Sequence, residues 1–138
     1  MGDNLNGNWN TYHLVLVIKY RGVLISEEFF DSLMAIFMKI ALEHGIVVRQ
    51  VNWEFDHIHV LFEAEPGTDL AEFVKSYQTI SSEIMKKHYP IIKGRLWIRD
   101  FWQGNYFIAT TDEADIEDIR RYIETQREKR PYYKDFGI

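Results

Sequence analysis

The order of strand-like and helix-like segments along the 138 residues predicts an α+β fold built on one antiparallel sheet. Three observations lead to this prediction. Apolar and β-branched runs indicate strands, apolar residues at helical spacing indicate two amphipathic helices between them, and a further amphipathic segment follows the last strand. Because no repeat or low-complexity linker interrupts the pattern, residues 1–138 are expected to form a single domain.

The first strand is expected over residues 12–20, where the sequence YHLVLVIKY is almost entirely apolar. Such a run is typical of a strand that is buried on both faces and lies in the middle of its sheet. An amphipathic helix is expected over residues 27–44, since Ser26 can cap it and two glutamates occupy its first turn. Gly45 suits the end of this helix.

The next two strands, over residues 46–55 and 57–63, are expected to pair through a tight connection at Asp56. A second helix is then expected to begin after the capping residue Asp69 and to end near His88.

An aromatic-rich strand follows over residues 96–110, and a third helix is expected after a capping box of Thr110 and Glu113, ending near Lys129. The first six elements have the ferredoxin-like order β-α-β-β-α-β, with two helices on one face of the sheet. The last helix is an addition to this fold. Residues 1–10 and 131–138 are expected to be a flexible N-terminal segment and a C-terminal tail.

Composition limits the chemistry. The chain has no cysteine, which excludes disulfides and thiolate metal ligands and suits a reducing cytoplasm, the location we expect. The longest apolar run is too short to cross a membrane, and no glycine-rich phosphate loop for a nucleotide cofactor is present. The net charge is −5, yet residues 1–74 hold 4 basic and 11 acidic residues while residues 75–138 hold 12 and 10. A local basic surface in the second half can therefore bind phosphates.

The most informative motif is His57-Ile58-His59. Residues two apart in a strand point to the same face, so both imidazoles are expected to project together while Ile58 faces the helices. Two neutral imidazoles on one face can hold a divalent metal ion. The alternative is a pair of histidines on an ordinary strand.

A second pair, Tyr122 and Gln126, lies four residues apart on the predicted third helix and so shares one helix face. On its own this pair also fits a surface tyrosine on an amphipathic helix. Basic residues near it and on the second helix are candidates for contacts with DNA phosphates, although interleaved acids equally suit a solvated helix surface. These candidates are Arg120, Arg121, Lys75, Lys86, Lys87 and Arg127.

Four stretches together resemble the insertion-sequence-200-type single-tyrosine HUH transposases. They are YHLVLVIKYR at residues 12–21, DHIHVLFEAEP at 56–66, LWIRDFWQGNYFIATT at 96–111 and IRRYIETQ at 119–126. The resemblance implies that Tyr122 is the nucleophile and that His57, His59 and Gln126 bind the metal, Mg²⁺ or Mn²⁺. Asp56 directly precedes His57. It is expected either to fix the orientation of a metal ligand through a hydrogen bond or to form the turn between the two strands.

The resemblance also implies an activity: cleavage and rejoining of single-stranded DNA through a 5′-phosphotyrosine link. It further implies a homodimer and recognition of hairpins at element ends. The sequence is also compatible with three other functions. The chain could be a host-adopted relative that processes chromosomal repeats, a non-catalytic nucleic-acid-binding module, or a metal enzyme acting on a small molecule.

Overall fold

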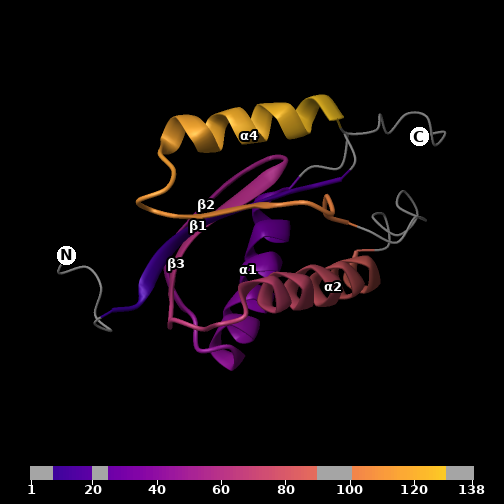
Figure 1. Ribbon diagram of the computed structural model, residues 1–138. Helices are drawn as coiled ribbons and strands as arrows, with labels where there is room; N and C mark the ends of the chain where they lie inside the picture. The colour runs from indigo at the N-terminus through magenta and orange to yellow at the C-terminus, as the bar shows by residue number, and fades with distance from the viewer. Residues whose placement is uncertain (1–7, 20–24, 90–100, 130–138) are drawn as a thin grey trace.

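A computed structural model of the chain describes residues 8–19, 25–89 and 101–129. The described residues form a four-stranded antiparallel sheet in the order β2-β3-β1-β4, with α1 and α2 on one face and α4 on the other (Figure 1). This strand order confirms the expected ferredoxin-like α+β fold. The strands are β1 (Asn10–Val17), β2 (Val47–Glu54), β3 (His57–Ala64) and β4 (Phe107–Thr110), and the helices are α1 (Glu27–Glu43), α2 (Leu70–His88) and α4 (Ile116–Lys129).

Strand β1 lies inside the sheet, between β3 and β4, as its apolar sequence predicts. Its second half, from Leu14 to Val17, and the adjoining Ile18 are at most 1% exposed. Leu14 and Leu16 belong to the main core under α1 and α2, whereas Val15 and Val17 face α4 on the opposite side. The central strand therefore carries an apolar layer on each of its faces.

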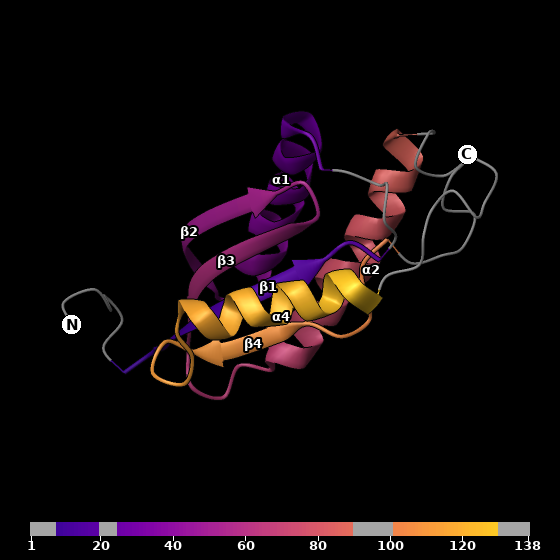
Figure 2. The ribbon, with the colours of Figure 1, turned by 90° about the horizontal axis from the view of Figure 1, so that it is seen from above.

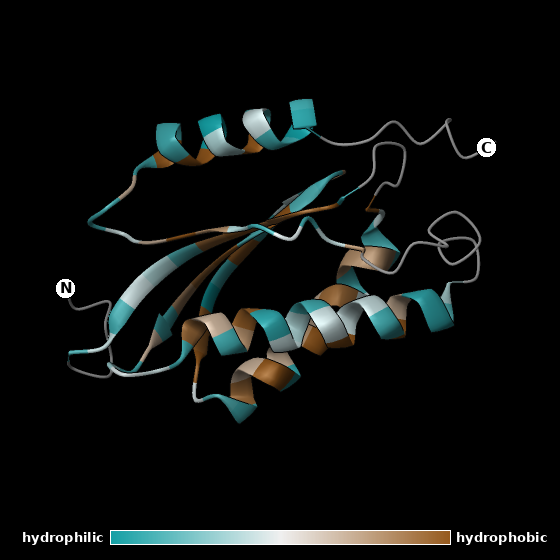
Figure 3. Cartoon of the chain, turned by 45° about the vertical axis from the view of Figure 1, so that its right-hand side comes forward, coloured by the Kyte–Doolittle hydropathy of each residue, from teal (hydrophilic) through white to brown (hydrophobic). Residues whose placement is uncertain are grey.

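The two predicted helix starts are confirmed by their capping contacts. The backbone N–H of Phe29 donates to Oγ of Ser26 at 3.1 Å, and the N–H of Glu72 donates to Oδ1 of Asp69 at 3.0 Å. Both helices turn their apolar sides toward the sheet (Figure 3). No helix in the described ranges is long and apolar enough to span a membrane.

Aromatic rings fill the main core between the sheet and these two helices. The ring of Phe37 on α1 makes edge contacts with Phe73 and Tyr77 on α2, at centroid distances of 5.3 and 4.9 Å. The buried hydroxyl of Tyr77 donates to the carbonyl of Leu33 at 3.0 Å, so its polar atom is satisfied. This core covers the face of the sheet opposite α4.

The last strand is shorter than the predicted range of 96–110. Regular pairing with β1 covers only Phe107–Thr110, and an isolated bridge joins Ile18 to Trp102. Around that bridge, the N–H of Lys19 donates to the carbonyl of Phe101 at 3.0 Å and the N–H of Gln103 donates to the carbonyl of Val17 at 2.8 Å, while the buried Trp102 donates from Nε1 to Oγ of Ser81 on α2 at 2.9 Å. Pairing with β1 is interrupted at residues 104–106, between this short paired segment and β4, while residues 96–100 lie outside the described part.

The predicted capping box at Thr110 and Glu113 forms a turn and does not start the helix. Thr110 remains paired with Tyr12 in the sheet, and its N–H donates to Oε1 of Glu113 at 2.8 Å. The reciprocal contacts that start α4 lie five residues later, where Asp115 and Asp118 each accept the other's backbone N–H at 3.1 and 2.9 Å. Strand pairing of Thr110 therefore delays the helix to Ile116.

Helix α4 lies along β1 and β4, with β3 and β2 beside it (Figure 2). Ile119 and Ile123 of the helix pack against Val15 and Val17 in a small second core. Ile116, which shares the apolar stripe in sequence, is 58% exposed. Two isoleucines of the stripe therefore attach this helix to the sheet.

Candidate functional site

The two histidines of the His-Ile-His motif lie on the sheet face that α4 covers. In the register of β1 and β3, His57 is opposite Val17 and His59 is opposite Val15, the two valines that contact α4. Ile58, between the histidines, is 0% exposed in the main core on the other face. The prediction that both imidazoles project from one face is therefore confirmed.

His57 is held by the carboxylate of Asp56, the residue before it. Nδ1 of His57 lies 3.0 Å from Oδ1 of Asp56, and Asp56 is fully buried. Burial by itself raises the pKa of this carboxyl, but hydrogen bonds from His57 and Arg127 outweigh it and hold the pKa of Asp56 well below its usual range. An ionised carboxylate only accepts hydrogen bonds, so Nδ1 of His57 is the donor and, in the neutral ring, Nε2 carries the free lone pair.

His59 is paired with a third histidine, His13 on β1. Nδ1 of His13 and Nε2 of His59 lie 3.0 Å apart, with ring centroids at 5.2 Å. Burial, together with the charges of His13 and His57, lowers the pKa of His59 to about 4, and burial also lowers the pKa of His13. Both rings are therefore neutral at physiological pH, which is the form that binds metal ions.

Acidification should destabilise the protein through His59. Its folded pKa of about 4 lies below the unfolded value of 6.5, so the unfolded chain binds more protons between these two pH values. Stability is therefore highest above pH 6.5 and falls as the pH drops toward 4, by roughly 1–2 kcal/mol once solvent access to the ring is considered. Urea unfolding at pH 7.5 and pH 5 would measure this loss, and His59→Gln should reduce it; an equal loss in both proteins would assign the effect to other groups.

Tyr122 and Gln126 are both directed into the protein from α4. The hydroxyl of Tyr122 and Oε1 of Gln126 are buried, and neither has a hydrogen-bond partner among the described residues. Burial raises the pKa of Tyr122 to about 12, and its ring packs 5.5 Å from that of Phe107 on β4. Gln126 is 3% exposed, although an unpaired buried amide oxygen costs about 1–3 kcal/mol.

Replacement of Gln126 by Leu should therefore stabilise the fold. The leucine keeps a similar volume and removes the unpaired amide oxygen, so we expect the free energy of unfolding to rise by about 1 kcal/mol. Urea unfolding followed by tryptophan fluorescence would measure the change, with the exposed Thr125→Val as a matched control on the same helix. A loss of stability greater than about 1 kcal/mol would show that Gln126 makes a polar contact on which the fold depends.

A pocket of about 520 Å³ opens between β2, β3 and α4, and its lining includes both His57 and His59. Its other polar residues are Asn52, Glu54, Arg120, Glu124 and Arg127. Tyr122 instead lines a separate hollow of about 430 Å³ on the β4 side of the helix. The structure thus brings His57 and His59 together in one pocket and places Tyr122 and Gln126 on the helix that covers the same sheet face. The lining of the histidine pocket does not include Tyr122 or Gln126.

Two sets of side chains near this pocket could hold a cation. Glu54, Asp56 and His57 offer ligand atoms within 4.8 Å of one another. However, Arg127 contacts both carboxylates, and its charge opposes a second cation there. Nε2 of His57, the neutral ring of His59 and the unpaired Oε1 of Gln126 are donors of the kinds that divalent ions accept, so these residues fit a metal better.

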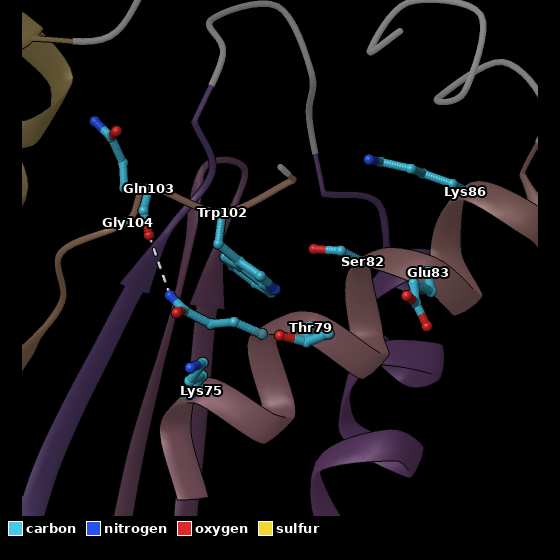
Figure 4. A pocket seen from close by; sticks show the side chains of 9 residues that line it. Lys75, Thr79, Ser82, Glu83, Lys86, Trp102, Gln103 and Gly104 are labelled. Atoms are coloured by element: carbon cyan, nitrogen blue, oxygen red, sulfur yellow. Dashed lines mark hydrogen bonds between the residues drawn. The ribbon is translucent and has the colours of Figure 1, made fainter. Parts of the chain in front are cut away.

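The candidate basic residues divide between two surfaces. Arg120 and Arg121 are exposed on α4, and each forms an ion pair with an acid three residues earlier. Lys75 and Lys86 line a groove of about 320 Å³ between α2 and residues 102–104, on the far side of the sheet from α4. Figure 4 shows them at opposite ends of this groove, with Thr79 and Ser82 between them.

The remaining two candidates differ in their surroundings. Lys87 is exposed in the last turn of α2. Arg127 is engaged by Asp56 and Glu54, and its side chain is 33% exposed. Arg127 therefore contacts carboxylates of its own chain, a role that the sequence did not predict.

The sequence did not indicate His13 as a residue of the site, nor Arg127 as a partner of Asp56. His13 belongs to an apolar strand, and its contact with His59 depends on the pairing of β1 with β3. Its position two residues before Val15 was the available signal, because strand alternation puts both on the α4 face. The contact of Arg127 with Asp56 spans 71 residues of sequence, and no local pattern indicates it.

Comparison with known proteins identifies the family of the chain. The sequence model of the family described as "Transposase IS200 like" matches residues 8–126. The chain is 35% identical over 118 residues to the ISDra2 transposase TnpA of Deinococcus radiodurans, covering 86% of this chain and 84% of that protein. It is 26% identical over 133 residues to the transposase for insertion sequence element IS200 of Salmonella typhimurium, covering 94% and 87%.

Two solved structures share the fold. A crystal structure of a candidate transposase from Deinococcus radiodurans R1 superposes with a TM-score of 0.76 at 30% identity, covering 86% of this chain and 91% of that one. A REP-associated tyrosine transposase bound to a REP hairpin superposes with a TM-score of 0.58 at 10% identity, covering 83% and 62%. Since the family match extends over most of the sequence and includes both histidines, Tyr122 and Gln126, the chain belongs to the IS200-like transposase family.

Proposed function

We propose that this transposase cleaves and rejoins single-stranded DNA by metal-dependent transesterification through a 5′-phosphotyrosine on Tyr122. The observation that supports this most is the sheet face beneath α4, where two histidines share a pocket and the helix above carries a buried tyrosine and an unpaired glutamine oxygen. Membership of a transposase family supports DNA as the substrate.

In the proposed reaction, the phenol oxygen of Tyr122 attacks the phosphorus of a DNA phosphodiester. The bond to the 3′ oxygen breaks, that oxygen leaves as a 3′-hydroxyl after taking up a proton, and the phenol proton passes to solvent or a nearby base. A 3′-hydroxyl of another strand later attacks the phosphotyrosine and releases the phenol. The number of phosphoester bonds is unchanged in each step, so no nucleotide cofactor is required.

The residues proposed to hold the metal are His57, His59 and Gln126. A divalent ion bound there, Mg²⁺ or Mn²⁺, would polarise the scissile phosphate and stabilise the leaving oxygen. Asp56 accepts a hydrogen bond from Nδ1 of His57, which leaves Nε2 of the same ring available to bind the metal. Tyr122 serves as the nucleophile, and its burial, which raises its pKa to about 12, keeps it protonated until a substrate is bound.

The separation of Tyr122 from the histidine pocket bears on how the active site is assembled. Attack requires the phenol and the metal-binding pocket to meet at one phosphodiester, so either α4 moves relative to its own sheet or a second subunit supplies the tyrosine. The protein is proposed to be a homodimer, in which the tyrosine helix serves either its own pocket after a shift or the pocket of the partner subunit. Mixing Tyr122→Phe with His57→Ala protein distinguishes these cases, because restored cleavage requires a tyrosine acting on its partner's pocket.

The proposal is tested with single-stranded DNA that forms a hairpin, since the REP-associated transposase of the same fold binds one. With Mn²⁺ or Mg²⁺, DNA labelled at its 3′ end should give a labelled adduct stable in SDS, while DNA labelled at its 5′ end should release a free labelled fragment. EDTA should abolish both products. A binding module would retain the DNA without cleavage, and an absence of adduct across a broad set of hairpin sequences would contradict the proposal.

A further inference from the structure

A single side chain on α4, Arg127, contacts three consecutive residues at the turn between β2 and β3. Its guanidinium donates to both carboxylate oxygens of Asp56, from Nη2 at 2.9 Å and from Nε at 2.5 Å, and Nη2 also lies 3.1 Å from Oε1 of Glu54. The guanidinium carbon lies 5.1 Å from the centre of the Phe55 ring. A planar guanidinium makes this forked contact in one orientation, which a lysine cannot reproduce.

The same carboxylate joins Arg127 to the histidine pocket. Oδ1 of Asp56 accepts from Nη2 of Arg127 at 2.9 Å and from Nδ1 of His57 at 3.0 Å. Because Asp56 is 0% exposed, its carboxylate has little freedom once both contacts are made. The position of α4 is thereby connected to the orientation of the His57 ring by two charge-assisted hydrogen bonds.

Arg127 also directly follows Gln126 in the sequence, so both lie in the same turn of α4. The contact between the Arg127 guanidinium and Asp56 fixes the position of α4 along the sheet and the rotation of α4 about its own axis. Those two quantities decide where the unpaired Oε1 of Gln126 points.

We propose that Arg127 is a positioning residue, which couples the docking of α4 to the orientation and tautomer of His57. Asp56 transmits the effect: with Arg127 in place, its carboxylate is fixed, Nδ1 of His57 carries the proton and Nε2 faces the pocket. The consequence for metal binding rests on the proposed function, whereas the effect on the His57 ring does not.

A purely structural anchor would behave differently. If Arg127 only attached the helix, its removal would lower stability without changing His57 in the folded protein. Arg120 provides the matched control, because it is an arginine on the same helix that lines the same pocket but pairs with the exposed Glu117.

The direct test is ¹⁵N NMR of the histidine side chains at neutral pH in the metal-free protein, recorded well below the unfolding midpoint of each variant. The wild type and Arg120→Ala should show His57 as the Nδ1–H tautomer, and Arg127→Ala should show a mixture of tautomers. Arg127→Lys should give an intermediate result, since a lysine supplies charge without the fork. An unchanged His57 spectrum in Arg127→Ala would overturn the inference.

A second readout is the affinity for Mn²⁺, measured from the electron paramagnetic resonance of the free ion. Loss of a residue that orients a metal ligand typically weakens binding by about 10- to 100-fold, and we expect this for Arg127→Ala against less than about twofold for Arg120→Ala. Asp56→Asn should lower affinity similarly, and the double variant should be no worse than the more affected single one.

The two readouts separate failure of the inference from failure of the proposed function. If the wild type binds Mn²⁺ through His57 and Arg127→Ala binds equally well, the coupling is wrong while the metal site stands. If the wild type does not bind Mn²⁺ but the His57 tautomer depends on Arg127, the metal site is wrong while the coupling stands.

Discussion

Replacement of Tyr122 by Phe should abolish formation of the covalent DNA adduct and lower strand cleavage by at least about a thousandfold, since the change removes the attacking oxygen itself. The fold should be unaffected. The hydroxyl of Tyr122 is buried and makes no hydrogen bond within the described residues, so its removal should not lower the free energy of unfolding. Single-turnover cleavage and urea unfolding measure the two effects on one preparation.

Tyr12→Phe is the matched control for this variant. Tyr12 is half-buried and stacks on Phe62 at 5.5 Å, on the sheet face away from α4, so the same atom is removed where no role in cleavage is proposed. We expect normal cleavage from this control. Equal activity in Tyr122→Phe and Tyr12→Phe would exclude Tyr122 as the nucleophile.

Replacement of either His57 or His59 by Ala should remove metal-dependent cleavage, with a loss of at least about a hundredfold for each. Each ring supplies a proposed metal ligand from the same pocket, and the neutral state of His59 is secured by a pKa near 4. Cleavage rate as a function of Mn²⁺ concentration is the measurement, because loss of a ligand raises the metal concentration needed for half-maximal rate.

The control for the histidine variants is His88→Gln. His88 is exposed at the end of α2, on the opposite side of the sheet from α4. We expect its metal dependence to match the wild type. Near-ultraviolet circular dichroism would establish that each alanine variant remains folded. Folded His57→Ala or His59→Ala protein with an unchanged Mn²⁺ dependence would exclude that histidine from the site.

The placement of the histidine pair could be predicted from sequence, because it depends only on the two-residue period of a strand. Ile58 is required on the core side, so His57 and His59 are directed to the other face whatever the rest of the sheet does. The helix caps could also be predicted, because Ser26 and Asp69 each accept a hydrogen bond from a backbone N–H only three residues later in the sequence.

The contacts that complete the site depend on tertiary structure and could not be predicted. His13 and His59 are 46 residues apart in the sequence, and the pairing of β1 with β3 brings them into contact. Arg127 and Asp56 are 71 residues apart and meet because α4 packs on the sheet. The side of α4 on which Tyr122 lies depends on helix rotation, which Ile119 and Ile123 set by packing on β1. Ile116, the first residue of α4, is 58% exposed although its spacing places it on the same helix face, so how far the apolar contact extends along the helix also depends on tertiary structure.

The central claim is that Tyr122 forms the covalent bond to DNA, and mass spectrometry of the adduct tests it most directly. Trypsin cleaves after Arg121 and Arg127, so the peptide of residues 122–127 contains Tyr122 as its sole tyrosine. After incubation with Mn²⁺ and hairpin DNA, followed by nuclease and trypsin, this peptide should carry a nucleotide through its tyrosine. A nucleotide on any other peptide, or cleaved DNA with this peptide unmodified, would contradict the account.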